Sequence, residues 1–337
     1  MPQVDTPQGA CRFGIARGDI TPPVGIYHRM WGAATHDRSE GVHRPLTATA
    51  AVFQPADATS EAPALVLVSL DHCLLWASEM RDFLSTVAER TGLSADELVV
   101  TFSHTHGAGL MGHERVELPG GELIGPYLAR VAETVATLVH EAFSSFQSVN
   151  IVYGFGRCSL TAHRDYWDEA AGQFACGFNP AGAADDTVLL ARLTDAAGQT
   201  VATVVNYACH PTTLAWQNRL ISPDYPGAMR ELVERETGAP CLFLQGASGD
   251  LGPREGFVGD VQVADRNGRE LGFAALSVLT ALPAAGTTFA YAGPVVSGAT
   301  LGTWAHLPID ADAAARHRAF RVRRWTVDLP YRADLPT

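Results

Sequence analysis

The clearest pattern of apolar positions lies between residues 64 and 103. Residues 64–70 form a continuous apolar run that is too short for a helix, which is typical of a strand covered on both faces of a sheet. Apolar residues then recur every three or four positions over 80–88, which predicts an amphipathic helix that ends at Gly92. A second apolar run occupies 98–103. This order and spacing predict a βαβ unit with two parallel strands.

The same kinds of pattern predict the remaining elements. Helices are expected at 127–142, 227–236 and 261–279, and strands at 151–155, 187–193, 201–207 and 241–244, with β-like sequence again after residue 287. A turn at 195–198 joins two of these strands, and Gly268 and Gly272 leave room for close packing of the third helix. No internal repeat or long linker divides the chain. We therefore expect one α/β domain over residues 1–337, with a mixed, largely parallel β-sheet core flanked by helices.

Composition narrows the possible chemistry. The 337 residues are 47% hydrophobic and 18% charged, which indicates an ordinary globular chain. The net charge of −12 makes nucleic acid an unexpected partner, because an acidic surface repels phosphate groups. All 24 basic residues are arginine, so the chain contains no lysine. A Schiff-base lysine, a pyridoxal-phosphate lysine and a P-loop lysine are all excluded.

The chain gives no signal for a membrane span or an oxidising compartment. No apolar run approaches the roughly 20 residues that cross a bilayer, and residues 1–14 lack the apolar segment of a signal peptide. The six cysteines stand singly, at Cys11, Cys73, Cys158, Cys176, Cys209 and Cys241. We predict a cytoplasmic protein without a transmembrane segment, whose cysteines are reduced and mostly buried.

Polar residues follow the ends of the expected strands. In parallel α/β sheets the carboxyl ends of the strands are where ligands bind. The residues found there are Asp71, His72, His104, His106, His210 and Asp250. Several imidazoles and carboxylates at one rim predict a metal site or an acid/base site.

The pair His104 and His106 is the strongest part of this set. Residues two apart on an extended segment share a face, and the glycines that follow at 107 and 109 leave room for a ligand. His210, which precedes a proline, is the next candidate. The remaining histidines are interpreted differently. We interpret His140, His306 and His317 as solvated or packed side chains, and His28, His36 and His43 as candidates for lining a pocket.

Two familiar motifs are only partly present. Residues 107–112 match the dinucleotide fingerprint G-x-G-x-x-G, but 113–121 contains Pro119 and no apolar stripe, so the required helix is missing. Ser248 lies one residue out of register for a G-x-S-x-G nucleophile elbow. The sequence therefore favours neither a Rossmann dehydrogenase nor a serine hydrolase of that type.

Taken together, several segments resemble the neutral/alkaline non-lysosomal ceramidases and their bacterial homologues. They occur in the family's order over roughly residues 12 to 330. The segments are Gly18-Asp19-Ile20-Thr21-Pro22-Pro23, Ser103-His104-Thr105-His106, Arg164, Asn179-Pro180, His210-Pro211-Thr212-Thr213, Ile221-Ser222-Pro223-Asp224-Tyr225-Pro226-Gly227 and Gly246-Ala247-Ser248-Gly249-Asp250.

The resemblance implies a fold, a metal and a reaction. The family's N-terminal catalytic domain binds one zinc ion and hydrolyses the amide of N-acylsphingosines. By resemblance His104 and His210 are zinc ligands, His106 contacts the reacting amide, and Arg164 lines the pocket. With Asp250, His106 and Arg164 form the predicted catalytic set. Zinc held by imidazoles polarises a carbonyl and lowers the pKa of a bound water to about 7, so no lysine or cysteine nucleophile is needed.

The sequence departs from the family pattern in two places. The family's remaining zinc ligands are a Glu after Pro-Gly and a Tyr in Gly-Tyr-x-Pro, and neither motif occurs after Gly252. We expect either that the chain lacks the family's C-terminal portion or that its metal shell differs. The family hexapeptide Gly-Asp-Val-Ser-Pro-Asn reads here Gly249-Asp250-Leu251-Gly252-Pro253-Arg254, so glycine replaces the serine.

The resulting prediction is a ceramidase-like, zinc-dependent hydrolase that cleaves the amide of a small-molecule or lipid N-acyl substrate with a metal-bound water. A homologue that keeps the fold without catalysis is an alternative, because the metal shell looks incomplete. A third possibility is a metal-dependent hydrolase of an ester or lactone, since the same water can attack those bonds. Metal analysis and a substrate screen discriminate among the three.

Overall fold

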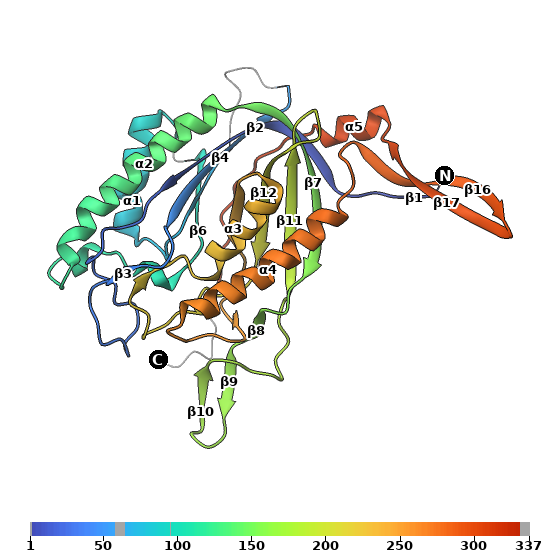
Figure 1. Ribbon diagram of the computed structural model, residues 1–337. Helices are drawn as coiled ribbons and strands as arrows, with labels where there is room; N and C mark the ends of the chain where they lie inside the picture. The colour runs from blue at the N-terminus through green and yellow to red at the C-terminus, as the bar shows by residue number, and fades with distance from the viewer. Residues whose placement is uncertain (1, 58–64, 95, 331–337) are drawn as a thin grey trace.

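The computed structural model describes residues 2–57, 65–94 and 96–330. Within these ranges the core is an eight-stranded sheet in the order β14-β12-β11-β7-β2-β4-β5-β6 (Figure 1). Its strands are β2 (Gln8–Asp19), β4 (Thr47–Pro55), β5 (Leu65–Leu70), β6 (Leu98–Phe102), β7 (Gln147–Arg157), β11 (Thr187–Thr194), β12 (Thr200–Tyr207) and β14 (Cys241–Gln245). The helices are α1 (Ala77–Thr91), α2 (Ile124–Ser144), α3 (Tyr225–Thr237), α4 (Val261–Ala281) and α5 (Ala311–His317).

The shorter elements surround this core. The strands outside the main sheet are β1 (Gln3–Val4), β3 (Gly41–Val42), β8 (Thr161–His163), β9 (Asp165–Asp168), β10 (Gln173–Cys176), β13 (Leu220–Ile221), β15 (Leu251–Pro253), β16 (Thr287–Ser297) and β17 (Ala299–Pro308). Three single-turn 3₁₀ helices are η1 (His106–Ala108), η2 (His113–Arg115) and η3 (Gly121–Leu123).

The predicted βαβ unit is confirmed. Strands β5 and β6 are parallel, with Val66 opposite Leu98 and Leu70 opposite Phe102. The connecting helix α1 ends at Gly92, whose φ of 73° is the left-handed conformation that glycine adopts without strain. The turn at 195–198 joins β11 and β12 as an antiparallel pair, also as predicted.

The prediction of a largely parallel sheet is wrong. Within the described residues only β5/β6 and β12/β14 are parallel neighbours in this sheet, and the other pairs are antiparallel. The error comes from β2 and β4, which sequence patterning did not reveal and which pair at the centre. In β2 the helix α2 packs so closely that a Cβ on Gly14 would lie 1.9 Å from the carbonyl oxygen of Ala142. Glycines therefore stand where apolar side chains would have marked a strand.

The helices cover two halves of the sheet, as Figure 1 shows. Helices α1 and α2 pack with β4 and β5 in one apolar core, and α3 and α4 pack with β11 and β12 in another. The expected close packing of α4 is present, because a Cβ on Gly268 would lie 2.4 Å from the carbonyl oxygen of Tyr225 in α3.

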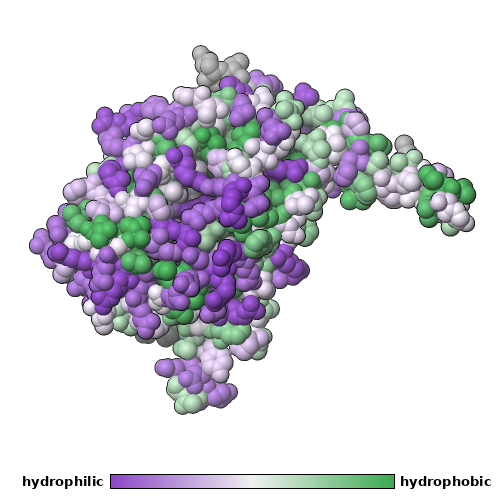
Figure 2. Space-filling model, viewed as in Figure 1, coloured by the Kyte–Doolittle hydropathy of each residue, from purple (hydrophilic) through white to green (hydrophobic). Residues whose placement is uncertain are grey.

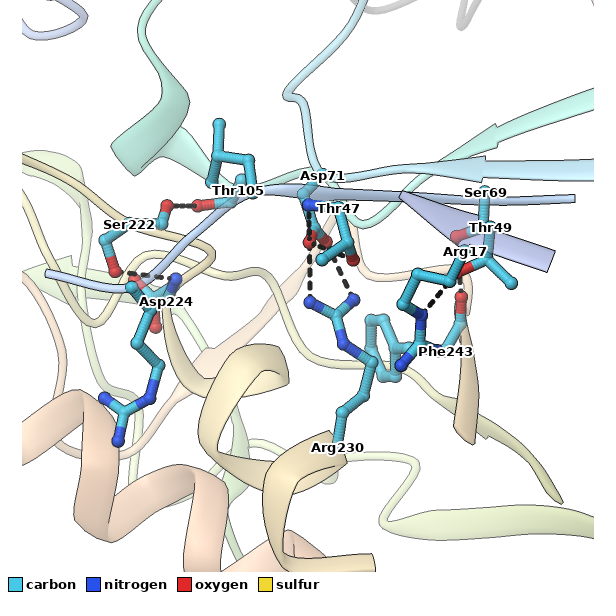
Figure 3. Close-up of polar contacts among 12 residues, drawn as sticks. Arg17, Thr47, Thr49, Ser69, Asp71, Thr105, Ser222, Asp224, Arg230 and Phe243 are labelled. Carbon is cyan, nitrogen blue, oxygen red and sulfur yellow. Dashed lines mark hydrogen bonds and ion pairs between the residues drawn. The ribbon is translucent and has the colours of Figure 1, made fainter. Parts of the chain in front are cut away.

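The sheet curls so that its two parallel strand pairs meet. Ser69 Oγ in β5 donates a hydrogen bond to the carbonyl oxygen of Phe243 in β14 over 3.1 Å, and Figure 3 shows these two residues side by side. In the strand order, β5 and β14 lie near opposite ends of the sheet. The curl therefore brings the loops after β6 and β12 toward each other.

A long hairpin projects from the body of the molecule. It consists of β16 and β17, with β1 paired to β16 (Figure 1). Its far end exposes apolar side chains, including Val296 at 82% exposure, and Figure 2 shows hydrophobic surface on this arm. In the part of the chain that the structure describes, no helix combines the length and apolarity needed to cross a membrane.

Candidate metal centre

The side chains of His104, His106 and His210 converge on one point. The His104 and His210 rings have centroids 4.5 Å apart, and the His106 ring lies 5.3 Å from the first and 5.0 Å from the second. The Nε2 atoms of His106 and His210 are separated by 3.1 Å. The convergence predicted from strand ends is therefore present, even though the sheet that produces it is mainly antiparallel.

The backbone around these residues is held in place by specific contacts. His104 has a φ of 65°, a left-handed conformation that is uncommon for a residue with a side chain. Its N–H donates to the carbonyl of His72, which ties the loop after β6 to the loop after β5. His106 begins the 3₁₀ turn η1, and its N–H points to the carbonyl of Pro211, next to His210. The loop after β6 is thus bonded both to the loop after β5 and to the loop that carries His210.

Hydrogen bonds to backbone carbonyls show which nitrogen carries a proton in two of the rings. His104 Nδ1 lies 2.8 Å from the carbonyl oxygen of Cys73, and His210 Nδ1 lies 3.2 Å from that of Ser248. A carbonyl oxygen only accepts, so both Nδ1 atoms carry the proton in these bonds. In a neutral ring this tautomer leaves the lone pair on Nε2, which is the state in which histidine binds a metal.

His106 differs from the other two rings. Its Nδ1 is buried and has no hydrogen-bond partner in the described part of the chain. Because the Nε2 of His210 is an acceptor, the 3.1 Å contact assigns a donor role to the Nε2–H of His106. The hydrogen-bond pattern therefore separates His106 from the two rings whose Nδ1 atoms donate to backbone carbonyls.

Burial keeps the imidazoles of His106 and His210 neutral. Burial lowers the pKa of His106 to about 3, with His210, His104 and the Arg164 charge adding to the effect. Burial also lowers the pKa of His210 to about 4, partly opposed by its bond to the Ser248 carbonyl. Both imidazoles are unprotonated at neutral pH, as metal binding requires.

A thiol lies beside the imidazoles. Donor atoms of Cys73, His104 and His106 all lie within 4.8 Å of one another, so this group can hold a metal ion. The Cys73 Sγ is 3.7 Å from His104 Nδ1, which already bonds to the Cys73 carbonyl. Burial raises the pKa of the Cys73 thiol to about 12, which disfavours the thiolate that binds metals. The imidazoles of His104 and His106 are therefore the stronger donors of this group, and His210 lies next to them.

Arg164, which the resemblance places at the pocket, lies next to His210. Its Nη1 is 3.3 Å from His210 Nδ1, and its Nε is buried with no hydrogen-bond partner among the described residues. The residue follows directly after β8, and its N–H donates to the carbonyl of Asp250. A fixed positive charge with an unused donor is available for a negatively charged group at this place.

An aromatic side chain packs on His106, and two more pack on that one in turn. The ring of Trp31 is tilted by 32° over that of His106, with centroids 5.0 Å apart. Trp216 and Phe257 contact Trp31 edge-on, at 6.3 and 5.7 Å. Sequence analysis missed all three, because they come from loops without periodicity. The only sequence signal was the Gly-rich segment that contains Trp31.

Asp250 does not join the imidazoles. Its carboxylate is 61% exposed and lies 3.9 Å from His163 Nε2. Its contact with the site runs through its main chain, which accepts from Arg164. The turn after β14 directs the side chain outward, which the sequence motif did not indicate.

Asp71 and His72 are also absent from the centre, although they follow β5. Asp71 is 1% exposed and forms a two-point ion pair with Arg230 of α3, as Figure 3 shows. His72 Nε2 lies 2.5 Å from the hydroxyl oxygen of Tyr127 in α2. Both residues therefore connect the strand to helices instead of facing a ligand.

The remaining histidines serve mainly packing roles. His28 Nε2 bonds to the carbonyl of Gly107 over 2.9 Å, and its Nδ1 lies 3.3 Å from His36 Nε2. His28 thus bonds to the loop that carries His106, and His36 contacts His28. His140 bonds to a backbone carbonyl on the surface and His306 stacks on Phe289, as expected for solvated or packed side chains.

Comparison with known proteins identifies relatives of this chain. The neutral ceramidase of Pseudomonas aeruginosa is 21% identical over 252 residues, which cover 72% of this chain and 37% of that protein. A solved structure of a ceramidase complexed with C2 matches with a TM-score of 0.65 at 19% identity, over 82% of this chain and 44% of that one. A crystal structure of the Pseudomonas aeruginosa neutral ceramidase matches with a TM-score of 0.64 at 20% identity, over 82% and 45%.

These likenesses establish the fold, and the chain spans less than half the length of the relatives it matches. A family assignment comes from the sequence itself. Residues 12–253 match the family described as neutral/alkaline non-lysosomal ceramidase, N-terminal, and this range holds all three converging imidazoles. The chain therefore belongs to the neutral/alkaline non-lysosomal ceramidase family.

Proposed function

We propose that this chain is a zinc-dependent hydrolase that cleaves the amide bond of an N-acyl, ceramide-like lipid. One observation carries the proposal: the rings of His104, His106 and His210 converge with centroids 4.5 to 5.3 Å apart, beside Arg164. Membership of the ceramidase family supports amide cleavage and a lipid substrate.

The residues at this point fit zinc. Zn²⁺ binds neutral imidazole nitrogens, and ligating histidines commonly donate their other N–H to a backbone carbonyl, as His104 and His210 do here. These two residues would hold the ion, with the Cys73 thiol close by. Bound zinc supplies Lewis acidity, which polarises a carbonyl and lowers the pKa of water.

His106 and Arg164 are the proposed catalytic residues. His106 Nε2–H, which contacts His210 in this structure, would be released once His210 Nε2 binds the ion, and could then donate a hydrogen bond to the amide oxygen or pass a proton toward the leaving amine. Arg164 adds a permanent positive charge that stabilises negative charge on that oxygen. Trp31, over His106, supplies an apolar wall suited to an acyl chain. Asp250 enters the proposal only through its main-chain contact with Arg164.

No serine nucleophile is part of the proposal. Gly252 stands where the family hexapeptide has serine, and a Cβ added there would meet only ordinary contacts at 3.9 Å, to Arg164 Cδ and Thr212 Oγ1. The position therefore lies beside the proposed catalytic arginine but carries no hydroxyl. We expect that hydrolysis proceeds without an acyl-enzyme.

Metal analysis is the first test. We expect purified protein to carry less than one equivalent of zinc, and His104→Ala or His210→Ala to remove what is bound, because each deletes one of the proposed imidazole ligands. His140→Ala, a surface histidine on α2, is the matched control and should keep the zinc. Tight, equimolar zinc in His210→Ala would show that other residues hold the ion.

A substrate screen is the second test. Short-chain N-acyl amides and the matching esters are compared for metal-dependent hydrolysis. We expect amide hydrolysis that falls about 100-fold in His106→Ala, which is typical for the loss of one transition-state hydrogen bond. Hydrolysis of esters but not amides would assign the chain to the ester-cleaving alternative. Metal-free protein with no hydrolysis of either class would indicate a homologue that keeps only the fold.

A further inference from the structure

A serine, a histidine and an aspartate form a chain of contacts outside the metal centre. His43 Nδ1 lies 2.9 Å from Ser222 Oγ, and His43 Nε2 lies 3.0 Å from Asp265 Oδ1. The order resembles that of a nucleophilic triad. However, Ser222 is 0% exposed, so its hydroxyl cannot reach a substrate from solvent. The contact chain needs another explanation.

The strand pairing explains why His43 meets Ser222. The short strands β3 and β13 are parallel, with Val42 opposite Ile221, and the N–H of His43 donates to the Ile221 carbonyl. The residues that directly follow the two strands are therefore neighbours. Asp265 approaches from α4, and Arg44 Nη1 also lies 2.5 Å from His43 Nε2. The His43–Ser222 bond forms with either tautomer, because a hydroxyl both donates and accepts.

The main chain of Ser222 holds the loop that carries His106. Its N–H donates to the carbonyl of Gly107 over 3.0 Å, and its carbonyl accepts from Thr105 Oγ1 over 2.8 Å. Thr105 Oγ1 in turn accepts from the N–H of Gly107. Figure 3 shows the contact between Thr105 and Ser222. The residues on both sides of His106 are thus bonded to this one serine.

The approach is so close that position 107 requires glycine. A Cβ on Gly107 would lie 2.7 Å from the carbonyl oxygen of Ser222. Ser222 Oγ also accepts from the N–H of Asp224, whose φ of 56° is unusual for a residue with a side chain. The hydroxyl therefore fixes the Ser222 backbone within a tightly packed turn.

We propose that His43 is a positioning residue for the metal centre, acting through Ser222 on the loop that carries His104 and His106. Asp265 and Arg44 both contact His43 Nε2 and together orient the ring, the ring orients the Ser222 hydroxyl, and the Ser222 backbone sets the loop. The effect of His43 on metal binding rests on the proposed function, because it requires that the site binds a metal. The effect of His43 on the loop at residues 103–109 can be measured without a metal.

Hydrogen exchange tests the loop directly. Metal-free full-length protein is analysed by mass spectrometry for exchange in peptides that cover residues 103–109. We expect His43→Ala to raise exchange at the Gly107 amide about fivefold, the effect of losing roughly one hydrogen bond. His43→Asn places an amide where Nδ1 lies and should return exchange to within about twofold of the wild type, a smaller change because that bond is kept. His43→Gln reaches only the Nε2 position and should behave like alanine.

Metal affinity provides the second readout, with His140→Ala as the surface control. Loss of a partner outside the metal ligands typically lowers affinity about 10- to 100-fold, so we expect cobalt(II) affinity to fall in that range for His43→Ala and His43→Gln but not for His43→Asn. Unchanged loop exchange in His43→Ala would overturn the proposal, as would equal rescue by Gln and Asn. If wild-type protein binds no cobalt, the proposed function fails, and loop exchange alone decides the role of His43.

Discussion

Two polar clusters lie at the ends of β5 and β6, and they differ in how their polar atoms are bonded. In the first, Asp71 accepts from the N–H and hydroxyl of Thr47 and from both terminal nitrogens of Arg230. In the second, His106 Nδ1 and Arg164 Nε are buried with no partner among the described residues. The Asp71 carboxylate is therefore fully bonded within the protein, whereas His106 and Arg164 have bonding capacity left for a ligand.

This difference separates structural polar groups from candidate functional ones. Most buried polar atoms are bonded within a fold, so two unbonded atoms beside the converging imidazoles make His106 and Arg164 candidates for contact with a ligand. Proximity to a strand end does not make the distinction, since Asp71 and His104 both follow strands of the same parallel pair. Mutations should therefore affect stability in the first cluster and metal binding in the second.

The largest expected effect is on stability, in Asp71→Asn. Removing one charge of a buried ion pair leaves Arg230 unpaired, which typically costs about 3–5 kcal/mol in the free energy of unfolding. Urea denaturation measures the loss, and zinc per folded molecule should be unchanged. Asp96→Asn is the control, because its ion pair with Arg324 is exposed and should contribute nothing measurable. A loss of zinc without a loss of stability would show that Asp71 serves the metal site instead of stabilising the fold.

The same ion pair predicts part of the acid sensitivity. Burial by itself raises the pKa of Asp71, but the charge of Arg230 and several hydrogen bonds outweigh it, so the pKa lies below 3.8 in the folded protein. A lowered folded pKa means that the stabilisation is present above 3.8 and is lost as pH falls toward the folded value. Denaturation midpoints measured below pH 5 should fall less steeply in Asp71→Asn than in the wild type. Parallel curves for the two proteins would argue against a titrating ion pair.

A smaller effect on stability is expected in the second cluster. His210→Ala removes a half-buried ring whose Nε2 bonds only to another imidazole. In metal-free protein we expect the free energy of unfolding to change by less than about 1 kcal/mol, while zinc binding is lost. Thermal unfolding with and without zinc separates the two contributions. If metal-free His210→Ala is as unstable as Asp71→Asn, the contrast between the clusters does not hold.

The smallest effect is expected in Gly252→Ser. The added side chain finds space beside Arg164 and Thr212, so stability should stay within about 0.5 kcal/mol of the wild type. The hydrolytic rate should stay within about twofold, because no step of the proposed reaction needs a hydroxyl there. Rates are measured on one amide substrate with metal content checked in both proteins. A large gain in rate, with an acyl group trapped on the new serine, would favour a covalent mechanism.

The sequence by itself determined the periodic elements and the residue types of the site. The helix that ends at Gly92 and the βαβ unit around it follow from local patterns of apolar residues. The motifs around His104, His210 and Arg164 were enough to indicate the family, which residues 12–253 confirm. Such features are local, and a chain segment carries them whatever surrounds it.

Tertiary structure alone decided the sheet and the division of roles within it. Gly14 stands in a central strand because α2 presses on it, so the strand lacks the apolar pattern that would predict it. The direction of a side chain after a strand depends on the turn that follows, which buries Asp71 against Arg230 and exposes Asp250 to solvent. The contact of His43 with Ser222 joins residues 179 positions apart. These arrangements depend on packing between distant segments, and no local pattern in the sequence encodes them.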